Sequence, residues 1–169
     1  CTIYKSLDSG IKEKPDFAII SNETSYHLPI IKKLIKSKIN FFVEKPLGNS
    51  LKNINDVLKI VNKKKIITQV GCNYRFHPFL KEIKKILKNN KLGRIISIRS
   101  ENGSYLPDWH LDENYEDGYA ARKNLGGGVI LTCIHELDYL FWLFGKISSL
   151  SSFVSKKSDL KIHSEDLAL

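Results

Sequence analysis

Apolar and polar residues alternate along the first 71 residues in two different periods. Short apolar runs rich in β-branched and aromatic residues occupy residues 16–20, 41–43 and 65–70, and runs of this kind are typical of buried strands. Between them, residues 25–36 and 50–61 place apolar side chains at helical spacing. The order strand, helix, strand, helix, strand predicts a right-handed parallel α/β unit, half of a doubly wound sheet.

The pattern changes after residue 71. Residues 79–90 form a lysine-rich amphipathic segment, and residues 94–101 alternate as a strand with one solvated face would. Residues 147–154 and 160 onwards look like further strands. We therefore expect a second, α+β domain with an antiparallel sheet.

The first candidate catalytic residues follow the end of the second apolar run. Pro46 cannot donate to a sheet ladder, so the strand should stop with Glu44 and Lys45 at its carboxyl end, where ligands bind in open α/β sheets. One interpretation is a solvated charge pair that ends a strand. The other is an amine held at a crevice, where partial burial lets it exchange protons with a substrate hydroxyl or carbonyl.

Residues 102–124 form a long aromatic stretch without periodicity. Structureless loops of this length are usually functional or disordered, and the aromatic content argues against disorder. A surface loop pinned by aromatic anchors remains the alternative.

Residues 129–144 give the strongest helical pattern, preceded by three glycines at 126–128. The glycines leave backbone N–H groups at the helix start that could meet a negative group. His135 and Asp138 are three residues apart and share a face. His135 is either a satisfied core residue or a catalytic group whose tautomer and pKa are set by a carboxylate.

Composition narrows the classes of function. The chain of 169 residues is 42% hydrophobic and 27% charged, which excludes disorder. The net charge of +9 comes from lysines scattered along helical faces, which argues against nucleic-acid binding. No apolar run approaches about 20 residues, so no membrane span is expected.

Three cysteines, far apart and without a Cys-x-x-Cys pair, indicate neither a disulfide framework nor a metal site. This usage fits a reducing cytoplasm. Because the chain lacks methionine and begins at Cys1, we expect it to be a fragment cut at both ends. No Gly-x-Gly-x-x-Gly precedes residue 71, so the phosphate loop of a dinucleotide fold lies upstream or the fold is of another kind.

Several motifs in order resemble one family. These are Glu44-Lys45-Pro46, the stretch 71–76, the glycines 126–128 and the run 135–138. Together they resemble the glucose-fructose oxidoreductase and inositol dehydrogenase family, Gfo/Idh/MocA. The resemblance implies part of a Rossmann domain for NAD or NADP over residues 1–72, lacking its amino-terminal portion, then part of an α+β domain with an open antiparallel sheet over residues 73–169.

The same resemblance implies roles for individual residues in oxidising or reducing a sugar-like alcohol. Lys45 and His135 would be catalytic, assisting hydride transfer. The residues expected at the cofactor are Asn22, His27, Glu44, Lys45, Pro46 and Asn73. The aromatic-rich loop adds a hypothesis for the substrate, a pyranose for which a nucleotide-linked or acidic sugar is one option. The residues expected to hold it, besides His135, are Arg75, Tyr105, Trp109 and Arg122.

One departure and two rival functions accompany this hypothesis. Thr132 stands among the positions where the family often has an aspartate, and a threonine cannot act as a base near neutral pH. Some relatives cleave glycosidic bonds on the same scaffold through transient oxidation. A non-catalytic binding remnant is the other rival, and a homo-oligomer is expected of the full-length protein.

Overall fold

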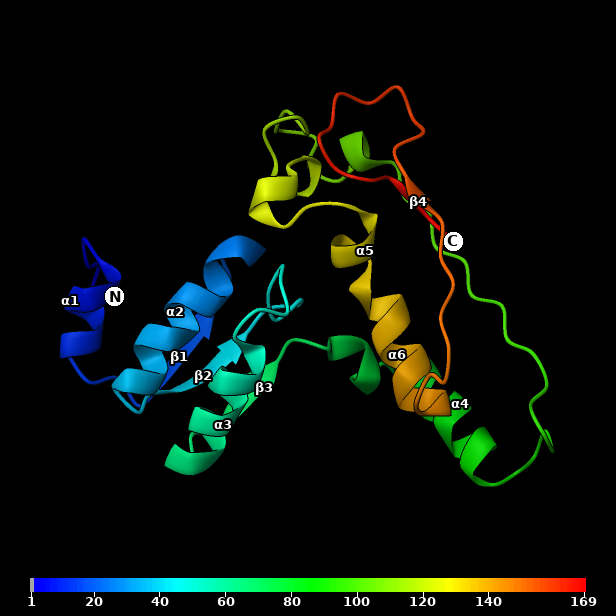
Figure 1. Cartoon of the computed structure of the whole chain (residues 1–169), viewed down its shortest axis with the longest axis horizontal. Coiled ribbons are helices and arrows are strands. Elements are labelled where there is room, and N and C mark those ends of the chain that lie inside the picture. The colour runs from blue at the N-terminus through cyan, green and yellow to red at the C-terminus, as the bar shows by residue number, and fades with distance from the viewer. Residues whose placement is uncertain (1) are drawn as a thin grey trace. The chain divides into compact units, whose positions relative to one another are not determined.

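The computed structural model describes residues 2–169, which divide into two compact units (Figure 1). The first unit runs to Gly71 and includes the short segment Asn124–Gly126. The second consists of Cys72–Lys123 and Gly127–Leu169. Each unit is described by itself.

The first unit is the predicted parallel α/β unit. Its helices and strands, in chain order, are α1 (Leu7–Lys12), β1 (Phe17–Ile20), α2 (Thr24–Lys36), β2 (Asn40–Val43), α3 (Ile54–Lys64) and β3 (Thr68–Val70). The three strands pair in parallel in the order β1-β2-β3. The sequence pattern therefore predicted the type and order of the five elements from β1 to β3 correctly.

The register brings the three strand ends to one edge. Ile20 on β1 lies opposite Val43 on β2, and Val43 lies opposite Val70 on β3. The residues that follow these positions consequently emerge side by side. The prediction that the second strand stops with Glu44 and Lys45 at its carboxyl end is confirmed, since β2 ends at Val43 directly before them.

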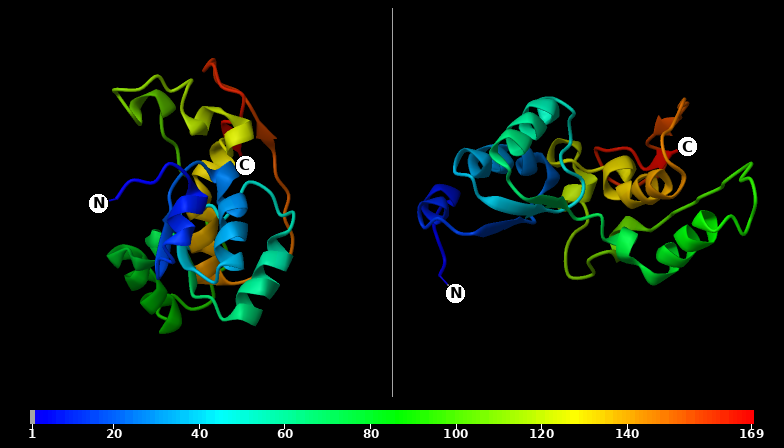
Figure 2. Two further views of the ribbon diagram at one scale, coloured as in Figure 1. Left: turned by 90° about the vertical axis from the view of Figure 1, so that its left-hand side faces the viewer. Right: turned by 90° about the horizontal axis from the view of Figure 1, so that it is seen from below.

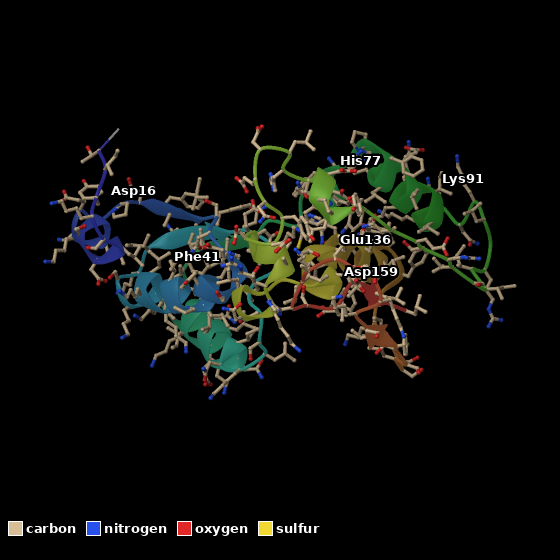
Figure 3. All side chains as sticks on the ribbon, turned by 90° about the horizontal axis from the view of Figure 1, so that it is seen from above. Asp16, Phe41, His77, Lys91, Glu136 and Asp159 are labelled. Atoms are coloured by element: carbon tan, nitrogen blue, oxygen red, sulfur yellow. The ribbon has the colours of Figure 1, made fainter. Side chains whose placement is uncertain are left out.

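Helices α2 and α3 cover the same face of the sheet (Figure 2). Phe41, labelled in Figure 3, points into this core and is 3% exposed. Each such side chain contributes about 1.5–3 kcal/mol by leaving water. The other buried members of the core are Ile20, Leu28, Ile31, Leu34, Ile35, Ile39, Val43, Val57, Val61 and Ile66.

The opposite face of the sheet is open within the described residues. Phe17 and Ile19 on β1 are 51% and 69% exposed, and Phe42 on β2 is half-buried. The predicted burial of these strands is therefore confirmed on only one face within residues 2–169, because both connecting helices lie on that side.

The second unit is mainly helical. Its elements are η1 (Asn73–Phe76), α4 (Pro78–Lys88), η2 (Leu106–Asp108), η3 (Tyr119–Ala121), η4 (Lys123–Leu125, shared with the first unit), α5 (Val129–Thr132), α6 (Ile134–Phe144), β4 (Val154–Ser155) and β5 (Leu167–Ala168). The η elements are single 3-10 turns. Strands β4 and β5 pair in antiparallel fashion.

Residues 94–101 were predicted as a strand, and this is wrong. The segment is extended but pairs with no other strand among residues 2–169, and Ile96 is 92% exposed. Alternating side chains alone do not make a strand, since the backbone N–H and C=O groups need a neighbouring strand to bond with.

The helix expected over residues 129–144 is interrupted at Cys133, which separates α5 from α6. Taken singly, no helix in the described part of the chain has the length and apolarity to cross a bilayer. Residues 123–132 and 134–144 are two helical segments bent by 47°, and they reach the required length and apolarity only when they are taken together.

Candidate functional site

The carboxyl edge of the parallel sheet positions Glu44 and Lys45. The N–H of Glu44 donates to the carbonyl of Ile20 at 2.8 Å, and the N–H of Gly71 donates to the carbonyl of Val43 at 2.8 Å. These bonds extend the sheet pairing one residue beyond the strands. Glu44 and Lys45 are therefore held, half-buried, at the end of the central strand, followed by a cis bond to Pro46.

Gly71 leaves room for the Glu44 carboxylate. A Cβ atom added to Gly71 would lie 2.9 Å from Oε2 of Glu44 and 3.1 Å from Cζ of Phe42. The lack of a side chain at the end of β3 thus lets this carboxylate reach across the edge. The sequence contains Gly71 in its motif, but its relation to Glu44 follows only from the sheet register.

His27 lies behind the same edge and is 1% exposed. Its Nδ1 is 2.8 Å from the carbonyl oxygen of Pro46, and its Nε2 is 2.9 Å from the carbonyl oxygen of Asn22. The Asn22 side chain itself is exposed. His27 therefore joins the turn after β1 to the turn after β2.

His135 is stacked against Tyr74 in the second unit. The two ring centroids are 4.3 Å apart and the ring planes differ by 4°. Tyr74 belongs to η1 and His135 to the first turn of α6. A parallel aromatic contact of this kind restricts rotation of the imidazole.

Arg75 and Asp138 form an ion pair next to this stack. Nε of Arg75 donates to Oδ2 of Asp138 at 2.9 Å, and Nη2 donates to Oδ1 at 2.5 Å. Burial acts to raise the pKa of Asp138, but the hydrogen bond and charge of Arg75, the Cys72 thiol and the nearby His135 outweigh it, so the pKa is lowered. The hydrogen bond to Asp138 raises the pKa of Arg75 above its ordinary value, against the effect of burial.

The aromatic stretch 102–124 is a loop with short 3-10 turns. Nε1 of Trp109 donates to Oγ of Ser104 at 2.6 Å, whereas Tyr105 is 60% exposed. Arg122 forms an ion pair with Asp117 at 2.5 Å. These bonds favour an ordered loop.

Trp109 also lines a cavity of about 140 Å³ within the second unit. Thr132, Cys133 and Ser164 line it as well. The hydroxyl of Thr132 donates to the carbonyl of Gly128 at 2.7 Å, so it acts as a hydrogen-bond donor within its own helix turn.

Two of the three glycines, Gly127 and Gly128, use their N–H groups within the chain. Gly127 donates to the carbonyl of Arg122 at 3.0 Å, and Gly128 donates to that of Ala120 at 3.0 Å. Val129 donates to the carbonyl of Glu165 at 2.9 Å. The expectation of unsatisfied glycine N–H groups at this helix start is therefore wrong for Gly127 and Gly128, because carbonyl oxygens of the chain itself accept their hydrogen bonds.

The predicted residues fall into two groups, one in each unit. Along the sheet edge of the first unit lie Asn22, His27, Glu44, Lys45 and Pro46. The second unit holds Asn73, Arg75, Tyr105, Trp109, Arg122 and His135. Of these, the structure brings Arg75 and His135 into one cluster with Tyr74 and Asp138.

Sequence analysis assigned no role to Tyr74 and no partner to Arg75. The available signal was that both stand in the motif 71–76 and precede His135 and Asp138 by about 60 residues. Among residues 2–169, no three His, Cys, Asp or Glu side chains are grouped so that they could hold a metal ion.

The polar side chains at the sheet edge suit the binding of a nicotinamide dinucleotide. Glu44 offers a carboxylate beside a glycine, and Asn22 offers an exposed amide. A carboxylate accepts hydrogen bonds from ribose hydroxyls, and an amide can both donate and accept. These residues could therefore hold the sugar and amide groups of such a cofactor.

Comparison with known proteins agrees with this geometry. Residues 1–72 match the description "Oxidoreductase family, NAD-binding Rossmann fold", and residues 80–169 match "GFO/IDH/MocA C-terminal domain". The described chain is thus covered by the two domains of one family.

Individual relatives point the same way. The chain is 29% identical over 150 residues to levoglucosan dehydrogenase of Pseudarthrobacter phenanthrenivorans, covering 86% of this chain and 38% of that protein. It is 30% identical over 146 residues to scyllo-inositol 2-dehydrogenase (NAD(+)) of Bacillus subtilis, covering 85% and 39%. The chain therefore spans well under half the length of these two relatives.

A solved structure shows the same fold. The WlbA dehydrogenase from Bordetella pertussis, in complex with NADH and UDP-GlcNAcA, superposes with a TM-score of 0.80 at 17% identity, over 98% of this chain and 47% of that one. With both domain descriptions matched and the parallel sheet in place, the chain belongs to the Gfo/Idh/MocA family of oxidoreductases.

Proposed function

We propose that the whole protein transfers a hydride between NAD or NADP and a hydroxyl- or carbonyl-bearing carbon of a sugar-like substrate. The observation that carries this proposal is the position of Lys45. Lys45 directly follows Glu44 at the end of the central strand of a parallel sheet and is half-buried at its carboxyl edge. Ligands of doubly wound sheets bind at this edge.

Lys45 and His135 are the proposed proton-handling residues. Oxidation of a carbinol requires its hydroxyl proton to be taken up, and reduction of a carbonyl requires a proton to be supplied. An amine and an imidazole can each do either near neutral pH when the protein places them within hydrogen-bond reach. When bound, the nicotinamide cofactor supplies the hydride or accepts it.

The substrate class is supported by the second unit and by the relatives. Trp109 and Tyr105 offer aromatic faces for sugar rings, and Arg122 offers a guanidinium at an exposed position. Two of the relatives are named as dehydrogenases of a sugar derivative and of an inositol. A pyranose or cyclic polyol is therefore the substrate class that we propose, with an acidic or nucleotide-linked sugar as its finer form.

We propose different roles for Arg75 and Arg122. Two nitrogens of Arg75 donate to Asp138. We therefore propose that Arg75 mainly orients the cluster of Tyr74, His135 and Asp138, and that substrate contact is its secondary role. Arg122 is paired with the 73% exposed carboxylate of Asp117, which a substrate anion could replace at small cost.

The test compares Lys45→Ala and Lys45→Arg with Lys32→Ala in the full-length enzyme. Lys32 is an exposed lysine on α2, so it controls for the loss of one positive charge. We expect Lys45→Ala to lower kcat by about 10²–10⁴-fold, and Lys32→Ala to have little effect. Turnover would be followed through the nicotinamide absorbance.

Product analysis decides between the rival functions. A dehydrogenase yields net reduced or oxidised cofactor, whereas a glycosidase of the same scaffold yields cleaved sugar with no net change. Unaltered turnover of Lys45→Ala on the true substrate would refute the proposed role of Lys45. Binding of the cofactor without turnover of any sugar would favour a binding remnant.

The remaining parts of the proposal concern the domain boundary, the oligomeric state and the cellular compartment. We place the boundary between the cofactor domain and the substrate domain at residues 72 and 73. A homo-oligomeric, cytoplasmic enzyme is expected, and within the described residues Cys72 and Cys133 form no disulfide, which suits a reducing compartment.

A further inference from the structure

His27 has an arrangement of partners that a neutral imidazole cannot satisfy. Its two ring nitrogens lie 2.8 and 2.9 Å from the backbone carbonyl oxygens of Pro46 and Asn22. Carbonyl oxygens only accept hydrogen bonds, and a neutral imidazole has one donor and one acceptor nitrogen. One nitrogen lone pair would then face a carbonyl lone pair at hydrogen-bond distance, which is repulsive.

We infer that His27 is a buried imidazolium that donates to both carbonyls and so clamps the two turns at the carboxyl edge of the sheet. The doubly protonated ring satisfies both oxygens with charge-assisted hydrogen bonds. The ring is 1% exposed beside the apolar core residues Leu28 and Ile31, so the two carbonyl oxygens supply the hydrogen bonds that a buried polar group requires.

The segments that His27 joins carry more negative than positive side chains. The two joined segments carry Glu23 and Glu44 against the single amine of Lys45, so their carboxylates outnumber their cations. The early turns of α2, to which His27 belongs, oppose a cation through the helix dipole. The two carbonyl dipoles aimed at the ring nitrogens act in the opposite sense and at closer range.

The clamp makes His27 a positioning residue for Lys45. The carbonyl that Nδ1 bonds belongs to Pro46, the residue directly after Lys45. Fixing that carbonyl to the turn after β1 restricts the backbone from which the Lys45 side chain extends. This consequence rests on the proposed function, whereas the protonation state of the ring does not.

The protonation state can be measured on the unsubstituted chain. Long-range ¹⁵N–¹H NMR spectra at neutral pH distinguish a ring with two protonated nitrogens from one with a bare nitrogen. We expect two protonated nitrogens for His27, and the exposed His110 serves as an internal reference for the spectrum of a histidine ring. A bare nitrogen on His27 would overturn the inference.

Assignment need not depend on one variant. The ring signal that disappears in His27→Gln belongs to His27. If His27→Gln does not fold, the other four histidine signals can be assigned with single variants, and the remaining signal belongs to His27. These variants are His77→Gln, His110→Gln, His135→Gln and His163→Gln.

The positioning role is tested in the full-length enzyme. We expect His27→Leu to lower kcat about tenfold or more, His27→Gln to recover part of the loss through its single amide donor, and the exposed His163→Gln to match the parent. Equal kcat in the parent and His27→Leu would overturn the positioning role. Unchanged turnover of Lys45→Ala would instead count against the proposed function, whatever the NMR spectra show.

Discussion

Tyr74 lies parallel to His135, with 4.3 Å between the ring centroids. The stack joins the connector that follows the parallel sheet to the first turn of α6. It places an aromatic face against the imidazole that the proposed mechanism uses for proton transfer. The stack can therefore be tested separately from the acid–base chemistry itself.

Replacing Tyr74 by leucine should release the imidazole, whereas Tyr74→Phe should retain the stack. Aromatic pairs contribute about 1 kcal/mol beyond burial, so we expect kcat of the full-length enzyme to fall about fivefold in Tyr74→Leu and to change little in Tyr74→Phe. Steady-state kinetics of both variants check this. Equal losses in the two variants would indicate that the Tyr74 hydroxyl, not the stack, is important.

The Arg75–Asp138 pair should give a measurable coupling energy. The Asp138 side chain is 13% exposed and that of Arg75 is 39% exposed, so solvent screens part of the attraction. We expect about 1 kcal/mol in a double-mutant cycle of Arg75→Lys and Asp138→Asn. Urea unfolding of the four proteins measures it, and additive losses would show that the two groups act independently.

The same pair should make stability depend on pH on the acid side. The pKa of Asp138 is lower in the folded chain than its ordinary value of about 3.9. Its stabilisation is therefore complete above that ordinary value and is lost as pH falls through the folded pKa. Asp138→Asn should remove this part of the decrease, which is measured as the free energy of unfolding against pH. A parallel decrease in both proteins would assign the acid sensitivity to other carboxyl groups.

Gly127 should not tolerate a side chain. A Cβ atom at this position would overlap the backbone carbonyls of Tyr119 and Ala120, which cannot move without shifting the loop. We expect Gly127→Ala to lower the free energy of unfolding by about 2–3 kcal/mol. Gly103→Ala, where nothing lies within 4 Å, is the matched control and should stay within about 0.5 kcal/mol.

Gly71→Ala should act on the cofactor edge more than on stability. The added methyl group would displace the Glu44 carboxylate, a flexible group, from its present position. We expect the Kd for the nicotinamide cofactor to rise about tenfold, the equivalent of one lost hydrogen bond to a charged group, while unfolding changes little. An unchanged Kd beside an intact fold would separate Glu44 from cofactor binding.

Local pattern determined the elements of the first unit. The apolar runs at β1 and β2, the helical spacing of α2 and the Pro46 stop are properties of neighbouring residues, so the sequence predicted them. The same reasoning failed at residues 94–101, where the alternation is present but residues 2–169 provide no partner strand. It also failed at Cys133, where an apolar composition continues through a break in the helix.

By itself, the sequence determined the family, the parallel α/β order and the placement of Glu44 and Lys45 at a strand end, because short-range periodicity and motif order encode these. Only the tertiary structure decided that Arg75 binds Asp138, 63 residues away, that two of the glycine N–H groups are used internally, and that His27 faces two carbonyls. Such contacts depend on how distant segments meet, and their geometry is set by packing and strand register rather than by the neighbours of each residue in the chain.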